Sequence, residues 1–192
     1  MKRLVLFLWL ACIAAIASPT VTFAQDTPQP TPTPDWHVYD DPAMHFRAPD
    51  GFFPVGQRHL ALGDLSQDSV VVAGWIYPNK DHPRRLVIEQ AAFDGDVDGW
   101  ESVYENQLRD QFDNPFFKDK TDTKLRNGMP AKFLEMTTGE GFSVQKFYML
   151  IWADGERGVA LLLQTKMDDI SALNARVLLS DATAVRYPVE SP

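Results

Sequence analysis

Cysteine is almost absent from this sequence of 192 residues, and the only one is Cys12. It lies in an apolar run at residues 4–17, which follows the basic residues Lys2 and Arg3 and precedes small residues that end at Ala24. A basic start, a short apolar run and small residues before a cut are typical of a secretory signal peptide. We therefore predict that residues 1–24 are removed before Gln25. The mature chain would then have no cysteine, which excludes disulfides, thiol catalysis and cysteine-based metal sites.

A lipid anchor on Cys12 is the alternative interpretation of this segment, because an acylated cysteine would tether the protein to a membrane. Trp9 stands where a lipoprotein signal requires leucine, and residues 13–15 continue the apolar run. Cleavage before Gln25 fits the sequence better.

Clusters of positive charge and long apolar runs are also missing. The chain has a net charge of −8 and no group of lysines and arginines that resembles a nucleic-acid footprint. After residue 24 no apolar run approaches the ~20 residues that cross a bilayer. We expect a monomeric periplasmic or extracellular protein with no transmembrane segment in the mature chain and no nucleic-acid partner.

Proline is concentrated in residues 25–35, where it alternates with threonine and glutamine. This composition favours an extended polyproline II linker that forms no packed core. The sequence thus predicts three parts: a signal peptide at residues 1–24, a linker at 25–35 and a single domain at 36–192.

The domain shows five clear strand patterns and two helical ones. We predict strands at 69–77, 84–93, 129–138, 142–153 and 157–166, a last short strand at 183–187, and helices at 99–112 and 168–181. A hairpin is expected from 36–39 and 44–47. The side chains expected to point inward are Trp36, Val38, Met44 and Phe46 in the hairpin, Trp100, Val103, Tyr104, Leu108 and Phe112 in the first helix, and Ile170, Leu173, Val177 and Leu178 in the second. This order predicts an α+β fold in which two amphipathic helices pack on a curled antiparallel β-sheet.

The start of the domain carries a recognisable motif. Tyr39-Asp40-Asp41-Pro42, followed by Phe46-Arg47-Ala48-Pro49-Asp50-Gly51, resembles the Y-x-D-P…F-x-x-P-x-G opening of PsbP-like proteins. The first helix before residues 127–131, the long meander and the closing helix follow the same order. The resemblance implies a PsbP-like αβ sandwich and a non-enzymatic binding or accessory role, but it assigns no functional residue.

An acidic segment fits the pattern of a calcium-binding loop. Asp94, Asp96, Asp98 and Glu105 have the spacing D-x-D-x-D-G-x5-E, with Gly99 at the turn. Calcium prefers six to eight oxygen ligands, which such a loop can supply. The alternative is an acidic turn that caps the first helix, with Asp98 as the N-cap and Glu101 completing a capping box.

Other candidate sites rest on fewer residues. His37 and His45 could lie across the first hairpin as a transition-metal pair, or could simply be exposed histidines. The motifs G-x-S-x-G, H-E-x-x-H and G-x-x-x-x-G-K-[ST] do not occur in the sequence. The sequence therefore favours an exported non-enzymatic protein that binds an unknown protein or small-molecule partner, and the alternative is an extracytoplasmic hydrolase that uses two carboxylates.

Overall fold

The computed structural model describes residues 35, 37–41, 44–55, 69–139, 144–167 and 169–185. They belong to one compact unit, Pro34–Pro192. The predicted signal peptide, the linker as far as residue 34, and Trp36 lie outside the described residues. Within the described part of the chain, no helix combines the length and the apolar character that a membrane span requires.

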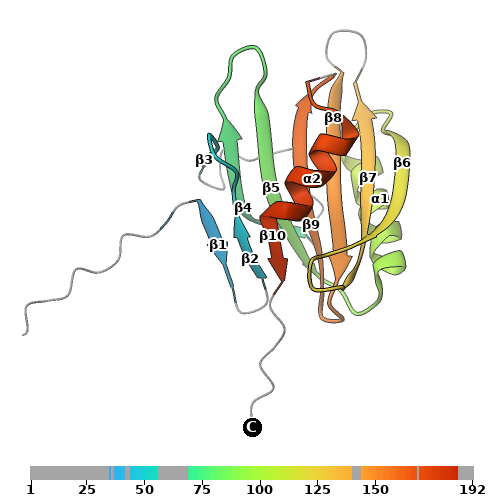
Figure 1. Cartoon of the computed structure of the whole chain (residues 1–192). Helices are drawn as coiled ribbons and strands as arrows, with labels where there is room; N and C mark the ends of the chain where they lie inside the picture. Colours follow the sequence, from blue (N-terminus) through green and yellow to red (C-terminus); the bar gives the residue numbers. More distant parts are fainter. Residues whose placement is uncertain are drawn as a thin grey trace, which may run out of the picture. The chain divides into compact units, whose positions relative to one another are not determined.

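A large antiparallel sheet forms the centre of the fold (Figure 1). It has seven strands in the order β3-β4-β5-β9-β8-β7-β6, and each neighbouring pair is antiparallel. The strands are β3 (Phe53–Pro54), β4 (Ser69–Tyr77), β5 (Arg84–Ala92), β6 (Phe116–Lys124), β7 (Pro130–Thr138), β8 (Gln145–Ala153) and β9 (Arg157–Lys166).

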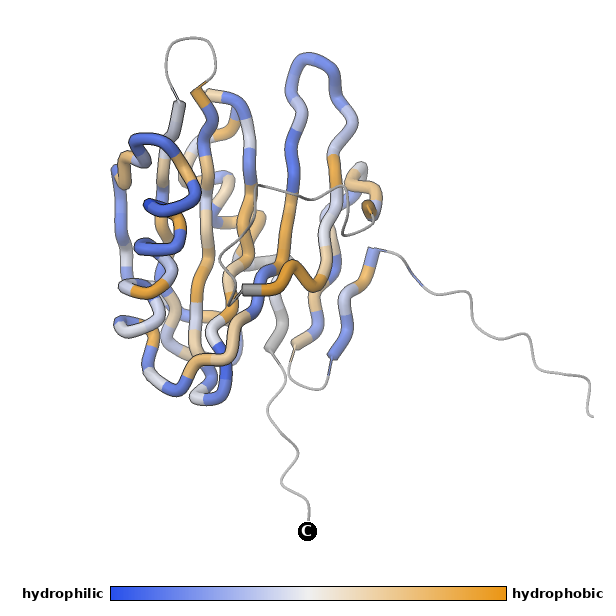
Figure 2. The backbone as a smooth tube through the Cα atoms, turned by 180° about the vertical axis from the view of Figure 1, so that it is seen from behind, coloured by the Kyte–Doolittle hydropathy of each residue, from blue (hydrophilic) through white to orange (hydrophobic). Residues whose placement is uncertain are grey.

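The remaining elements cover the two faces of this sheet. Helix α2 (Ala172–Ala182) lies on the face turned to the viewer in Figure 1, and helix α1 (Val97–Gln111) lies on the opposite face, which Figure 2 shows from the front. A three-stranded sheet of β1 (Val38–Asp40), β2 (Met44–Arg47) and β10 (Thr183–Val185) packs on the α2 side through Met44 and Phe46.

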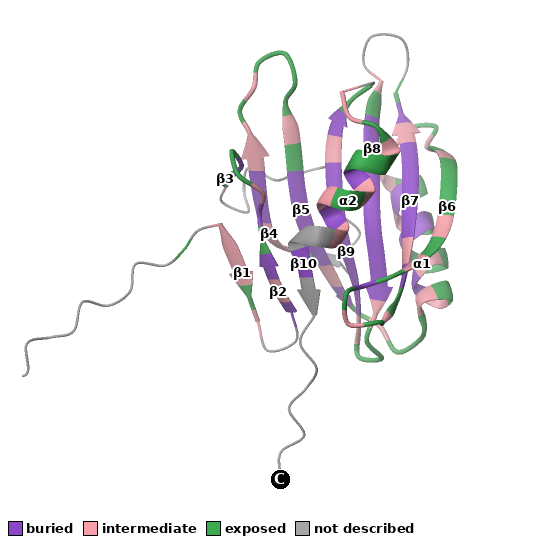
Figure 3. Cartoon of the chain, viewed as in Figure 1, coloured by how far each residue is buried: buried purple, intermediate pink, exposed green. Residues whose placement is uncertain are grey.

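Two hydrophobic cores result, because successive side chains of a strand point to opposite faces. In β8, Tyr148, Leu150 and Trp152 belong to the core under α2, whereas Phe147, Met149 and Ile151 belong to the core under α1. The central strands are therefore buried on both faces, while β6 at the edge is mainly exposed (Figure 3). This explains why the sequence of β8 is one continuous apolar run.

The predicted α+β class is confirmed, and the structure corrects two details of the strands. Strand β6 was not predicted, because its charged sequence has little strand character at an exposed edge. In the hairpin, Tyr39 pairs with Phe46 and packs against the core, whereas Val38 pairs with the exposed Arg47. The prediction that Val38 points inward was thus wrong by one residue, which turns the strand over.

The predicted inward face was right for α1 except at Val103, and it was wrong for half of α2. Trp100, Tyr104 and Leu108 are each 1% exposed, as predicted, and the partly buried Phe112 packs on them, but Val103 is 38% exposed. In α2 the buried side chains are Ala175 and Leu179, with Ile170 and Leu178 partly buried against the core. Leu173 and Val177, predicted to point inward, are exposed.

The buried face of α1 gives a direct test of its packing. Leu108→Ala should lower the free energy of unfolding by about 2–5 kcal/mol, because it removes buried methyl groups and leaves a cavity. Asn106→Ala changes an exposed position of the same helix and should cost under ~0.5 kcal/mol. Urea unfolding measures both, and equal costs would contradict this orientation of α1.

Candidate functional site

The acidic segment before α1 forms a helix cap. The side chain of Asp96 accepts a hydrogen bond from the Gly99 amide at 2.9 Å, which makes Asp96 the N-cap. The helix starts at Val97, so Asp98 and Gly99 lie in its first turn. Asp98 was predicted to be the cap, and the structure corrects the position by two residues.

Two lysines of the neighbouring strands neutralise three acidic side chains of α1, namely Asp98, Glu101 and Glu105. Lys132 Nζ lies 2.5 Å from Asp98 Oδ1 and 2.5 Å from Glu101 Oε2. Lys120 Nζ contacts Glu105 and lies 3.3 Å from Glu101 Oε1. Hydrogen bonds to Asp98 and Glu101 raise the pKa of Lys132. Burial raises the pKa of Glu101, but the bonds to Lys132 and Lys120 outweigh it and the net pKa is lowered.

These contacts bear on the predicted calcium ligands. Asp98 and Glu105 are both engaged by ammonium groups, whereas Asp94 and Asp96 are exposed. Among the described residues, no group of three or more acidic, histidine or cysteine side chains is placed to hold a metal ion as it stands. A calcium ion would have to displace lysines, and calcium binding stays a prediction of the sequence.

The two candidate histidines are separated along the hairpin. His45 lies opposite Asp40, and its Nδ1 is 3.3 Å from Asp40 Oδ1. His37 precedes β1, and its carbonyl accepts a hydrogen bond from Ala48. The expectation that the two imidazoles are cross-strand neighbours was therefore wrong.

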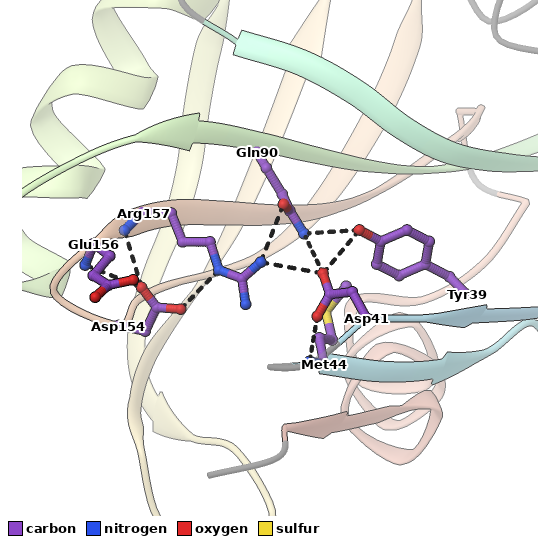
Figure 4. Close-up of polar contacts among 7 residues, drawn as sticks. All are labelled: Tyr39, Asp41, Met44, Gln90, Asp154, Glu156 and Arg157. Atoms are coloured by element: carbon purple, nitrogen blue, oxygen red, sulfur yellow. Dashed lines mark hydrogen bonds and ion pairs between the residues drawn. The ribbon is translucent and has the colours of Figure 1, made fainter. Parts of the chain in front are cut away.

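A polar cluster joins the small sheet to the large one (Figure 4). Asp41 Oδ2 accepts a hydrogen bond from Tyr39 at 2.9 Å and lies 3.1 Å from Arg157 Nη1. Gln90 bridges them, since its amide donates to Tyr39 at 3.3 Å and its oxygen accepts from Arg157 at 3.2 Å. Burial and the Asp41 carboxylate raise the pKa of Tyr39 to about 12. The tyrosine and aspartate of the PsbP-like opening motif thus hold the two sheets together.

A second polar cluster, which sequence reasoning missed, fixes the position of the segment between β9 and α2. The buried carboxylate of Asp169 lies 2.6 Å from Arg84 Nε and 2.6 Å from His82 Nδ1, and it accepts a hydrogen bond from Thr165 at 2.9 Å. The hydrogen bond from Arg84 lowers the pKa of Asp169. Because Arg84 and His82 are 85 and 87 positions away in the chain, no local pattern reveals this pairing.

Helix α2 presents aliphatic side chains to solvent. Leu173 is 71% exposed and Val177, one turn further on, is 51% exposed. Met167, in the connection from β9 to α2, is 51% exposed. Arg176 points elsewhere, with its guanidinium 4.7 Å from the centre of the Phe133 ring. We call Met167, Leu173 and Val177 the α2 surface. Leu173 and Val177 share one helix face at the spacing i, i+4, and exposed apolar patches are typical of binding sites.

The fold and these contacts define the class of protein: an α+β domain whose antiparallel sheet is covered on both faces. No protein-family model and no curated protein matches the sequence. The solution structure of cyanobacterial PsbP (CyanoP) from Synechocystis sp. PCC 6803 is similar, with a TM-score of 0.55 and 14% identity over 78% of this chain and 91% of that chain. This similarity confirms the predicted PsbP-like fold.

Two further solved structures are similar to the chain. PA94 from Pseudomonas aeruginosa, a protein of unknown function, has a TM-score of 0.51 and 15% identity over 72% of this chain and 99% of that chain. LpqN, involved in cell envelope biogenesis of Mycobacterium tuberculosis, has a TM-score of 0.49 and 13% identity over 77% of this chain and 87% of that chain. At these identities the similarity concerns the fold alone.

The calcium prediction can be tested by thermal unfolding. Competition from Lys120 and Lys132 places the expected Kd near ~10⁻³ M, the weak end of the extracellular range. Adding ~10 mM calcium would then stabilise the fold by about 1.4 kcal/mol, a rise in Tm of roughly 3–6 °C. Magnesium should do less, because it requires a smaller octahedral shell.

Asp94→Asn is the matched variant for this measurement. It removes the first predicted ligand without touching the Asp96 cap or the lysine contacts of Asp98 and Glu105. The variant should lose the calcium response while keeping the Tm measured in chelator. Melting curves of the unsubstituted protein that overlap with and without calcium would contradict calcium binding.

Proposed function

We propose that this protein is an exported, non-catalytic accessory protein that binds a partner protein through the α2 surface. The observation that carries the proposal is the exposure of Leu173 and Val177 on a helix whose other face is packed. Burying such side chains against a partner gains roughly 25 cal/mol per Å² of apolar area. Ser171, the N-cap of α2, and Asn174 in its first turn are also exposed, and both are polar but uncharged.

Two further observations support an accessory role. The PsbP-like fold agrees with the resemblance seen in the sequence, which implies a binding or accessory function. The polar clusters around Asp41 and Asp169 each tie distant parts of the chain together, so their charged groups already have structural partners.

The carboxylate hydrolase is not favoured by any particular observation. Such an enzyme needs two nearby carboxyl groups, one of them with a raised pKa. Glu101 and Glu105 do lie together, but both contact Lys120, and the pKa of Glu101 is lowered. Their arrangement fits ion pairing between α1 and the sheet better than acid catalysis.

Export is supported by the sequence pattern of residues 1–24. In the native host we expect the mature protein to begin at Gln25, because the small residues at Thr22 and Ala24 suit signal peptidase. The mass of the purified protein should therefore correspond to loss of residues 1–24. An intact Met1 in the cytoplasm, or a diacylglycerol group on Cys12, would contradict this part of the proposal.

The α2 surface is tested by site-specific photo-crosslinking in the native host. A photoreactive amino acid at position 173 or 177 should give one discrete adduct, since both positions face the partner. The same amino acid at position 106, on the exposed side of α1, serves as the matched control and should not give that adduct. The adduct from position 173 should disappear when Val177 is replaced by Lys, and circular dichroism should show an unchanged fold.

Mass spectrometry of the adduct then identifies the partner. Equal adducts from positions 106 and 173, or an adduct that survives Val177→Lys, would contradict partner binding at this surface. An adduct with twice the mass of the chain would show self-association in place of the expected monomer.

A further inference from the structure

A buried carboxyl group lies beneath α1 without a charged partner. Glu89 is in the middle of β5 and is 1% exposed. Its neighbours in the sheet are apolar, because it pairs with Val71 of β4 and Ala160 of β9. The next side chains on the same face of its own strand, Val87 and Ala91, are also apolar. A buried carboxylate in such surroundings is costly unless it is paired or protonated.

Helix α1 supplies the single hydrogen bond that the structure shows for this group. Tyr104 donates its hydroxyl proton to Glu89 Oε2 at 2.8 Å, and Tyr104 is itself 1% exposed. The other oxygen, Oε1, is buried and has no hydrogen-bond partner among the described residues. Burial beside Glu89 raises the pKa of Tyr104, so the tyrosine remains the donor at physiological pH.

The lysines of this region are engaged elsewhere. Lys120 and Lys132 contact acidic side chains of α1 at Glu101 and Glu105 and at Asp98 and Glu101, respectively. Of the described residues that face Glu89 from α1, β4 and β9, Tyr104 is the titratable one. Burial therefore dominates and raises the pKa of Glu89 to about 7, although the bond from Tyr104 opposes the rise.

We propose that Glu89 and Tyr104 form a pH-sensitive switch that fastens helix α1 to the sheet when Glu89 is protonated and loosens it when Glu89 ionises. In the loosened state water reaches the carboxylate and satisfies Oε1. The extracytoplasmic location proposed above would expose this switch to the pH of the surroundings.

The sign of the effect follows from proton linkage. The pKa of Glu89 is about 7 in the folded domain, whereas the pKa of the free group is 4.5. The folded state thus binds more protons than the unfolded state between these values. The stabilising contribution is fully present below pH ~4.5 and is lost as the pH rises to about 7.

Hydrogen exchange read by mass spectrometry tests the switch on the full mature chain. After correction for the intrinsic pH dependence of exchange, protection of α1 amides should fall on the order of tenfold between pH 5.5 and pH 8, as linkage to a group with this shift requires. Peptides from α2 serve as the internal reference and should change much less. In Glu89→Gln, which keeps an acceptor for Tyr104, α1 protection should not depend on pH.

Two further variants keep the test decisive. Glu135→Gln is the matched control, because Glu135 is also buried in the sheet but contacts Lys146 at 2.8 Å; it should leave the pH response of α1 unchanged. Tyr104→Phe removes the hydrogen bond that lowers the pKa of Glu89, so the midpoint of the Glu89 carboxyl ¹³C titration should move to higher pH.

Three results would overturn the proposal. The first is α1 protection that does not change with pH in the unsubstituted protein. The second is the same pH response in Glu89→Gln, and the third is equal loosening of α1 and α2. If Glu89→Gln does not fold, the titration in Tyr104→Phe decides: an unchanged midpoint overturns the switch.

Discussion

The close approach of Trp100 to the backbone of β9 determines how α1 meets the sheet. A Cβ atom placed on Gly158 would lie 2.1 Å from the Trp100 ring, so a side chain at this position is excluded while the ring is there. The indole nitrogen also donates a hydrogen bond to the Val159 carbonyl at 3.1 Å. This contact fixes the distance of α1 from the sheet and the rotation of the helix about its own axis. It brings Tyr104, one turn later, to Glu89, and Leu108 to the core.

With α1 on one face and α2 on the other, strands β8 and β9 are buried almost throughout. The ion pairs of α1 lie on the flank where the helix meets β6 and β7. Glu89 and Glu135 are both buried in the sheet, but Glu135 contacts Lys146, whereas the partner of Glu89 is the uncharged Tyr104. A polar group that weakens packing in this way is a common feature of sites that switch or bind.

The sequence predicts those parts of the fold that follow from local residue patterns. Strand β8 can be recognised in the sequence because a strand that is buried on both faces is a continuous apolar run. Helix α1 can be recognised because one buried face places apolar residues at helical spacing. The phase of the first strand depends instead on its pairing with β2, and the orientation of α2 depends on which side chains fit the sheet. Ala175 is buried where the larger Leu173 is exposed, so hydrophobicity alone selects the wrong face. The cap at Asp96 is a local contact with Gly99, whereas the lysines that contact Asp98 and Glu105 come from distant strands, so the spacing of the acidic residues does not reveal those ion pairs.

The opening motif illustrates why the resemblance predicts the fold better than the function. Tyr39 and Asp41 meet Gln90 and Arg157 between the two sheets, where they replace solvent with hydrogen bonds and an ion pair. A residue pattern that serves such a junction can persist on many proteins with different partners, since it says nothing about the outer surface. The parts free to differ are those that do not hold the sheets together: the exposed side of α2, with Leu173 and Val177, and the charge state of Glu89 under α1. Specific function in this fold is therefore expected in the helices and not in the junction that identifies it.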